Sequence, residues 1–181
     1  VPINMETPKA LLEVKGETLI ERLIKQLHQV GVTEIYVVVG FMKEQFEFLI
    51  DDYGVELIVN SDYAGKNNLH SLKLAADKLS NTYIVPCDIW CKNNPFSRNE
   101  LYSWYMLGDS YSEESDVRMN RKMEIVKTDK AQSGNTMIGI SYLLDEQAQR
   151  VKKQVLELCQ QERYNDSFWE EALYQKDKSH Q

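Results

Sequence analysis

The first clear pattern along the chain is an amphipathic helix that begins after Thr18 and ends before Gly31. Thr18 and Glu21 have the spacing of a capping box, in which the two residues bind each other's backbone N–H groups. Glycine commonly follows the end of a helix. The residues that fall on the apolar face of this helix are Leu19, Leu23, Ile24, Leu27 and Val30.

Strands and helices then alternate along the first half of the chain. The segment 34–40 is a continuous β-branched run that ends in glycine, which predicts a strand buried on both faces, as in parallel sheets. We expect helices at 43–53 and 68–79, and strands at 55–60 and 83–87. Short connections between such elements favour right-handed crossovers. The sequence therefore predicts an α/β fold: a three-layer, mostly parallel Rossmann-like sheet with helices on both faces.

Polar or small residues stand at the end of each predicted strand of this first half, at Gly40, Asn60 and Asp88. In open parallel sheets, ligands bind outside the carboxyl ends of the strands. We therefore expect the functional site along this edge.

The second half of the chain has a less regular pattern. It contains a polar acidic segment at 109–116, predicted strands near 123–127 and 137–143, and a helix expected from 145 to about 163 with Asp145 as its cap. The length of 181 residues suits one domain, and no repeat or linker divides it. We interpret residues 1–181 as a single domain.

Charge and cysteine content narrow the class of protein. The net charge of −7 argues against partners bound by bulk electrostatics, so we expect no nucleic acid and no membrane as a partner. Because no apolar run reaches the roughly 20 residues of a membrane span, we expect a cytoplasmic protein. Reduced thiols are favoured for Cys87, Cys91 and Cys159 over a disulfide or a zinc site. Oligomeric state is left open.

Two segments carry a resemblance to a known family. Residues 7–11 read Thr-Pro-Lys-Ala-Leu, which resembles the segment after the glycine-rich signature loop of bacterial nucleoside-triphosphate transferases. Residues 60–72 resemble the N-x-x-Y-x-x-x-N-N-x-x-S-L segment of the phosphocholine cytidylyltransferases. The chain is therefore similar to the phosphocholine cytidylyltransferase (LicC-type) branch of this nucleotidyltransferase superfamily, whose fold is that of the nucleotide-diphospho-sugar transferases.

The resemblance implies roles for particular residues. Lys9 matches the lysine that faces the phosphates, and Asp88 matches the aspartate that holds Mg²⁺, the expected cofactor. Amides and hydroxyls at a helix N-terminus suit recognition of a nucleobase and ribose, although one asparagine of the pair at 67–68 is also expected to cap the helix. The nucleotide-binding candidates are Gly40, Asn60, Tyr63, Asn67, Asn68 and Ser71.

The acceptor implied by the resemblance is an alcohol phosphate, most simply phosphocholine. A quaternary ammonium is held by aromatic faces and negative charge. Ser167 and Glu170 also have capping-box spacing, and core packing is a strong alternative for the two aromatic residues between them. The candidates for contact with the acceptor are Trp90, Asp116, Phe168, Trp169 and Glu170.

The predicted reaction is transfer of CMP from CTP to phosphocholine, giving CDP-choline and pyrophosphate. Other acceptors remain open: 2-aminoethylphosphonate, a sugar-1-phosphate or a polyol phosphate. Pro86 stands where relatives often carry a second acid, and we expect that the first strand, the G-x-G-x-R loop and the C-terminal end of the domain lie outside residues 1–181. Fusion to a further domain and a catalytically inactive nucleotide-binding domain are therefore further alternatives.

Overall fold

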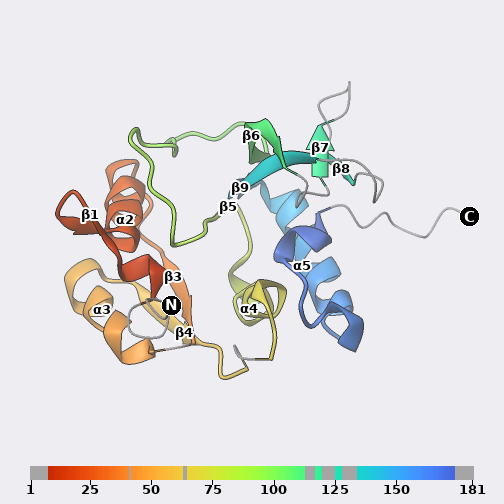
Figure 1. The fold of residues 1–181 in the computed structure, drawn as a ribbon, viewed down its shortest axis with the longest axis horizontal. Coiled ribbons are helices and arrows are strands. Elements are labelled where there is room, and N and C mark those ends of the chain that lie inside the picture. Colours follow the sequence, from red (N-terminus) through yellow and green to blue (C-terminus); the bar gives the residue numbers. More distant parts are fainter. Residues whose placement is uncertain are drawn as a thin grey trace, which may run out of the picture.

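The structure is a computed structural model, which describes residues 8–40, 42–62, 65–112, 117–119, 125–127 and 134–173. Figure 1 shows mixed strands and helices, with the N-terminal elements on one side and α5 with the longest strands on the other. The helices are α2 (Leu19–Gln29), α3 (Phe48–Tyr53), α4 (Asn68–Leu74) and α5 (Asp145–Leu158). The strands are β1 (Glu13–Val14), β2 (Glu17–Thr18), β3 (Tyr36–Val39), β4 (Glu56–Val59), β5 (Thr82–Ile84), β6 (Trp104–Ser112), β7 (Val117–Met119), β8 (Ile125–Lys127) and β9 (Gly134–Leu143). Short 3-10 helices are η1 (Lys9–Leu11), η2 (Lys43–Phe46), η3 (Ala76–Lys78), η4 (Glu162–Tyr164) and η5 (Trp169–Ala172).

Helix α2 begins with the capping box that the sequence predicts. The backbone N–H of Glu21 donates to Thr18 Oγ1 at 3.2 Å, and the N–H of Thr18 donates to Glu21 Oε2 at 3.4 Å. Its apolar face is buried, and the helix ends two residues before Gly31, which adopts a left-handed φ of 86°. The predicted amphipathic helix is confirmed.

Strands β3 and β4 form a parallel pair, with Val37 opposite Leu57 and Val39 opposite Val59. The α/β class and the parallel start of the sheet are therefore confirmed. Burial alternates along β3, where Val37 and Val39 are buried and their neighbours are only partly so. The prediction of a strand buried on both faces was therefore wrong for the face that carries Tyr36 and Val38.

Strand β9 lies between β5 and β6 and pairs with both in the antiparallel sense. Tyr142 of β9 is opposite Tyr83 on one side and Trp104 on the other. Helix α5 packs against this sheet, and Val151, Val155 and Leu143 share one buried cluster. We call this the C-terminal cluster; its other buried members are Leu69, Leu79, Ala148, Leu158, Trp169 and Ala172.

Several predicted element boundaries were too generous. The helix expected at 68–79 is α4 followed by η3, and the helix expected at 43–53 is η2 followed by α3. The strand expected at 83–87 is the shorter β5. The strand expected near 123–127 is β8, which pairs with β7 in the antiparallel sense. Strand β7 was not predicted from the sequence.

Two predicted helix caps were wrong because other segments supply the partners. Leu144, not Asp145, is the N-cap of α5, and the Asp145 N–H donates to Asn81 Oδ1 at 3.0 Å. The helix ends at Leu158, short of the expected 163. Phe168 is the N-cap of η5 and has no side-chain cap, so the proposed Ser167 and Glu170 box does not form.

Gly139 in β9 is required by both its conformation and its neighbour. Its φ is 98°, and a Cβ at this position would lie 2.7 Å from Pro86 Cγ. Pro86 therefore packs directly on the β9 backbone. This contact fixes the segment that leads from β5 to Asp88.

Gly139→Ala is expected to lower the free energy of unfolding by about 2–4 kcal/mol, because it combines backbone strain with overpacking against Pro86. Gly31 has a similar φ but nothing within 4 Å of an added Cβ, so Gly31→Ala is a matched control for strain alone, about 1–2 kcal/mol. Urea unfolding measures both. Equal losses in the two variants would contradict the close contact with Pro86.

Candidate functional site

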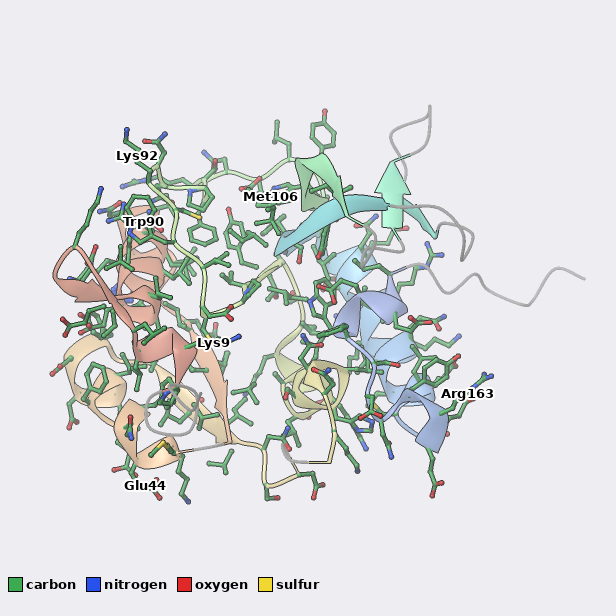
Figure 2. All side chains as sticks on the ribbon, in the orientation of Figure 1. Lys9, Glu44, Trp90, Lys92, Met106 and Arg163 are labelled. Atoms are coloured by element: carbon green, nitrogen blue, oxygen red, sulfur yellow. The ribbon has the colours of Figure 1, made fainter. Side chains whose placement is uncertain are left out.

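Lys9 lies on η1, a short turn held tightly against the core. The Leu11 N–H donates to Pro8 O at 2.9 Å, and the Leu12 N–H donates to Lys9 O at 3.1 Å. Ala10 is 4% exposed, whereas the Lys9 side chain is exposed. Figure 2 shows the Lys9 side chain extending toward the middle of the molecule. The turn therefore buries one residue and leaves its neighbour's cation available to a ligand.

Ala10 belongs to a buried cluster formed mainly by η1, α2, β3, η2 and α3, which we call the N-terminal cluster. Its buried members are Ala10, Ile20, Ile24, Val37, Val39, Phe46, Leu49 and Val55. Cys87 also packs against it, although Cys87 follows β5 in the other sheet. One apolar cluster thus holds both the residue after Lys9 and the residue before Asp88.

Burial of Cys87 raises the pKa of its thiol to about 11, and the neighbouring Asp88 carboxylate adds to this effect. The thiol is therefore neutral at physiological pH and is a poor nucleophile and metal ligand. Cys87, Cys91 and Cys159 are all free, as expected. Cys87 is an apolar attachment point rather than a reactive group.

Asp88 itself is exposed at the start of the segment that joins β5 to β6. Among the described residues, no group of three or more acidic, histidine or cysteine side chains could enclose a metal ion. Mg²⁺ is commonly held by one or two carboxylates together with water and substrate phosphates. A single exposed carboxylate therefore fits a cation that arrives with a nucleotide, and not a cage built by the protein alone.

Gly40 and Asn60 lie together at the carboxyl ends of β3 and β4. The Asn60 N–H donates to Val39 O at 2.7 Å, which brings the two strand ends side by side. Asn60 is buried, accepts from the Asp62 N–H at 3.0 Å and donates through Nδ2 to Ser71 Oγ at 3.0 Å. The structure thus brings together three of the residues for which we predict nucleotide contact. Both the oxygen and the nitrogen of the Asn60 side-chain amide are therefore already hydrogen-bonded within the protein.

Asn67 and Asn68 connect α4 to the segment 165–169. Asn67 Oδ1 accepts from the Asn68 N–H at 2.8 Å, and Asn67 Nδ2 donates to Asp166 O at 3.3 Å. Asn68 Oδ1 accepts from the Trp169 N–H at 2.7 Å, which caps η5 from across the chain. Adjacent asparagines therefore serve two elements here, and contact with a nucleotide stays a prediction.

The aromatic candidates for the acceptor lie on different parts of the molecule. The Trp90 ring is within 4.9 Å of both Lys15 Nζ and the Arg22 guanidinium carbon, on the α2 side (Figure 2). Trp169 is buried in the C-terminal cluster, while Phe168 beside it is 60% exposed. The structure does not bring Trp90 and Trp169 together in one box.

Glu170 is buried next to Trp169 and accepts from the Tyr105 hydroxyl at 3.0 Å. This contact ties η5 to β6. Tyr63 and Asp116, two further predicted site residues, lie outside the described part of the chain.

Arg22 and Gln26 are functional candidates that sequence reasoning missed. Both project from α2 and donate to the carbonyl of Cys91, at 2.9 and 3.0 Å. A glutamine only 5% exposed on a helix is unusual, but burial cannot be read from one sequence. The contact joins positions far apart in the chain, so no local pattern could have indicated it.

Comparison with known proteins places these features in a family. The family model for the MobA-like NTP transferase domain matches residues 4–100, more than half of the chain. The chain belongs to the MobA-like NTP transferase family. The family match covers η1, the β3–β4 pair, α4 and Asp88, which are the elements that form the candidate site.

Individual relatives extend the similarity beyond this region. The choline-phosphate cytidylyltransferase of Streptococcus pneumoniae is 30% identical over 95% of this chain and 76% of its own length. The 2-aminoethylphosphonate cytidylyltransferase of Lancefieldella rimae is 29% identical over 95% and 73%. A solved structure of the S. pneumoniae CTP:phosphocholine cytidylyltransferase (LicC) matches with a TM-score of 0.83 and 28% identity over 95% of this chain and 77% of that one. The predicted branch and its nucleotide-diphospho-sugar transferase fold are confirmed. Among the described residues, no helix is long and apolar enough to cross a membrane.

His70 is a buried titratable group on α4, next to the nucleotide-binding candidate Ser71. It is 6% exposed, and its Nε2 has no hydrogen-bond partner among the described residues. Burial lowers the pKa of His70, and the charges of Lys66 and Lys73 lower it further. The folded protein therefore favours the neutral imidazole.

This lowered pKa predicts a loss of stability in mild acid. The unfolded chain takes up a proton near the ordinary histidine pKa of about 6.5, whereas the folded chain resists it. Stability is therefore full above about pH 6.5 and falls as the pH drops below it. His70→Asn should flatten the decline in Tm between about pH 7.5 and 5.5, measured by circular dichroism. An unchanged slope in the variant would contradict this assignment.

Proposed function

We propose that the protein transfers CMP from CTP to phosphocholine, giving CDP-choline and pyrophosphate. Its similarity to a choline-phosphate cytidylyltransferase along nearly the whole chain supports this reaction. In the reaction, a phosphate oxygen of the acceptor attacks the α-phosphorus of CTP. The bond from that phosphorus to the oxygen that bridges the α- and β-phosphates breaks, and pyrophosphate leaves. No covalent bond to the protein is required.

The observation that carries this proposal is the shared packing of Ala10 and Cys87 in the N-terminal cluster. Because each is adjacent to a proposed catalytic residue, the cluster fixes the backbone beside Lys9 and beside Asp88 at once. Transfer at phosphorus is catalysed mainly by positioning and by neutralising charge. A cation and a carboxylate on rigidly held backbone meet that requirement.

Lys9 supplies positive charge to the phosphates of CTP. The net charge of the chain is −7, so attraction of a triphosphate depends on local cations such as this one. Its place on η1, where Ala10 is buried, keeps the ammonium group on the exposed side of the turn.

Asp88 would hold Mg²⁺ jointly with the nucleotide phosphates. Bound there, the cation would neutralise charge on phosphate oxygens during transfer. Among the described residues Asp88 has no hydrogen bond or ion pair that would compete for its carboxylate. An exposed and unengaged carboxylate is suited to this use.

Phe168 is the aromatic candidate best placed to meet the choline headgroup. Its ring is exposed, whereas Trp169 is buried and Trp90 already contacts two cations of the chain. An exposed ring can accept a quaternary ammonium on its face. A relative that acts on 2-aminoethylphosphonate supports a second candidate acceptor, which carries a primary ammonium.

Pyrophosphate release provides the direct assay. With Mg²⁺, CTP and phosphocholine, we expect release at least about tenfold faster than with ATP, GTP or UTP, or with 2-aminoethylphosphonate as acceptor. Preference for 2-aminoethylphosphonate would support the second candidate. Absence of release with every pair of substrates, despite measurable CTP binding, would contradict an active enzyme.

Asp88→Asn and Lys9→Ala should each lower turnover by about 10²-fold or more, because each removes charge stabilisation at the phosphates. Both side chains are exposed, so Tm should stay nearly constant. Asp52→Asn and Lys153→Ala are matched controls at exposed positions on α3 and α5, and should retain normal turnover. Normal turnover in Asp88→Asn or Lys9→Ala would refute the role assigned to that residue.

A further inference from the structure

The segment that joins β5 to β6, residues 85–103, contains Asp88 and has no helix or strand of its own. Figure 1 shows it passing over to α2 before it returns to β6. Structureless loops longer than about 12–15 residues are uncommon in compact domains and are usually functional. Such a loop keeps one conformation only if other parts of the chain bind its backbone.

Arg22 of α2 binds the backbone of this segment at two consecutive residues. Its Nε donates to Cys91 O at 2.9 Å, and its Nη2 donates to Lys92 O at 2.8 Å. Its Nη1 binds Glu17 Oε1 at 2.9 Å, which orients the guanidinium. The same group lies 4.9 Å from the centre of the Trp90 ring. Three consecutive loop residues therefore contact one side chain.

Two further hydrogen bonds join this segment to α2. Gln26 Nε2 donates to Cys91 O at 3.0 Å, and Asn94 Nδ2 donates to Gln26 O at 2.7 Å. On the other side of Asp88, Cys87 is packed against the N-terminal cluster. On the far side of Asp88, Ile89 and Cys91 also pack against the buried cluster that contains Leu23 and Leu27 of α2. Asp88 thus lies between an apolar attachment at Cys87 and a mixed attachment at residues 89–92, in which the polar part is made by Arg22 and Gln26.

We propose that Arg22 is a positioning residue, which holds residues 90–92 on α2 and thereby places Asp88 to bind the divalent cation with its nucleotide. This inference rests on the proposed function. It assigns to a helix residue a part in metal binding that is exerted through two backbone carbonyls.

Arginine is needed at this position because of its geometry. The guanidinium presents donors in a rigid planar fork, and here three of its nitrogens bind three separate acceptors. A lysine keeps the charge but cannot reach both carbonyls and Glu17 in the same way. Arg22→Lys therefore removes the simultaneous hydrogen bonds to Cys91 O, Lys92 O and Glu17 while leaving the local charge unchanged.

Lys25→Ala is a matched control. Lys25 lies on the same helix and also binds Glu17, at 3.1 Å, but among the described residues its side chain forms no hydrogen bond or ion pair with residues 85–103. Gln26→Leu removes one of the two donors to Cys91 O and should cause a smaller change than Arg22→Lys. Circular dichroism melts establish that each variant is folded at the assay temperature.

Two measurements test the proposal. The first is the rate of tryptic cleavage between Lys92 and Asn93, relative to cleavage in α5, identified by mass spectrometry. The carbonyl attacked is the one that Arg22 binds, so Arg22→Lys should cleave about tenfold faster as local opening becomes easier. The second is Mn²⁺ binding with CTP by electron paramagnetic resonance, together with turnover against Mg²⁺ concentration.

For Arg22→Lys we expect about tenfold weaker Mn²⁺ binding and a matching rise in the Mg²⁺ concentration for half-maximal turnover. Saturating Mg²⁺ should restore most of the maximal rate, which a general structural defect would not allow. Lys25→Ala should match the wild type in every measurement. Unchanged cleavage in Arg22→Lys, or faster cleavage with unchanged metal binding, would overturn the proposal. A wild-type protein that releases no pyrophosphate would instead overturn the proposed function, and the cleavage rates would still decide whether Arg22 holds the loop.

Discussion

Packing of Ala10 and Cys87 into one apolar cluster, the first buried and the second partly buried, is the constraint on which the candidate site depends. The two residues come from segments nearly eighty positions apart, and each is followed or preceded by a charged residue that faces outward. Apolar packing is not directional, but a close-packed cluster fixes the backbone that enters it. The cluster therefore anchors the backbone beside a cation, Lys9, and beside a carboxylate, Asp88.

Around this cluster, polar contacts complete the positions of the loops. Arg22 and Gln26 hold the loop after Asp88, and the asparagines at the start of α4 hold the segment 165–169. Each contact joins a regular element to an irregular one. The irregular segments, which have few backbone bonds of their own, therefore take their shape from side chains on helices. Loops that are held in place by helix side chains suit transfer at phosphorus, because catalysis of that reaction depends on positioning.

Much of the first half of the fold could be predicted because its signals are local. The capping box at Thr18 and the β-branched run of β3 lie within a few residues, and both were found where expected. Errors arose where a distant segment supplied the partner. Asn81 binds the first N–H of α5, and Asn68 binds the N–H of Trp169, so the caps expected from neighbouring residues do not form. Lys9 and Asp88 were proposed from their resemblance to family motifs. Arg22 was missed because its partners in the loop are about seventy positions away.

The proposed reaction joins a cytidylyl group to phosphocholine. Phosphorus-31 nuclear magnetic resonance of the protein with CTP, phosphocholine and Mg²⁺ follows that bond directly. We predict that the phosphocholine resonance declines while paired diphosphate resonances of CDP-choline and the signal of pyrophosphate grow in equal amounts. An unchanged phosphocholine resonance would contradict the proposed reaction, whether CTP stays intact or is hydrolysed to other products.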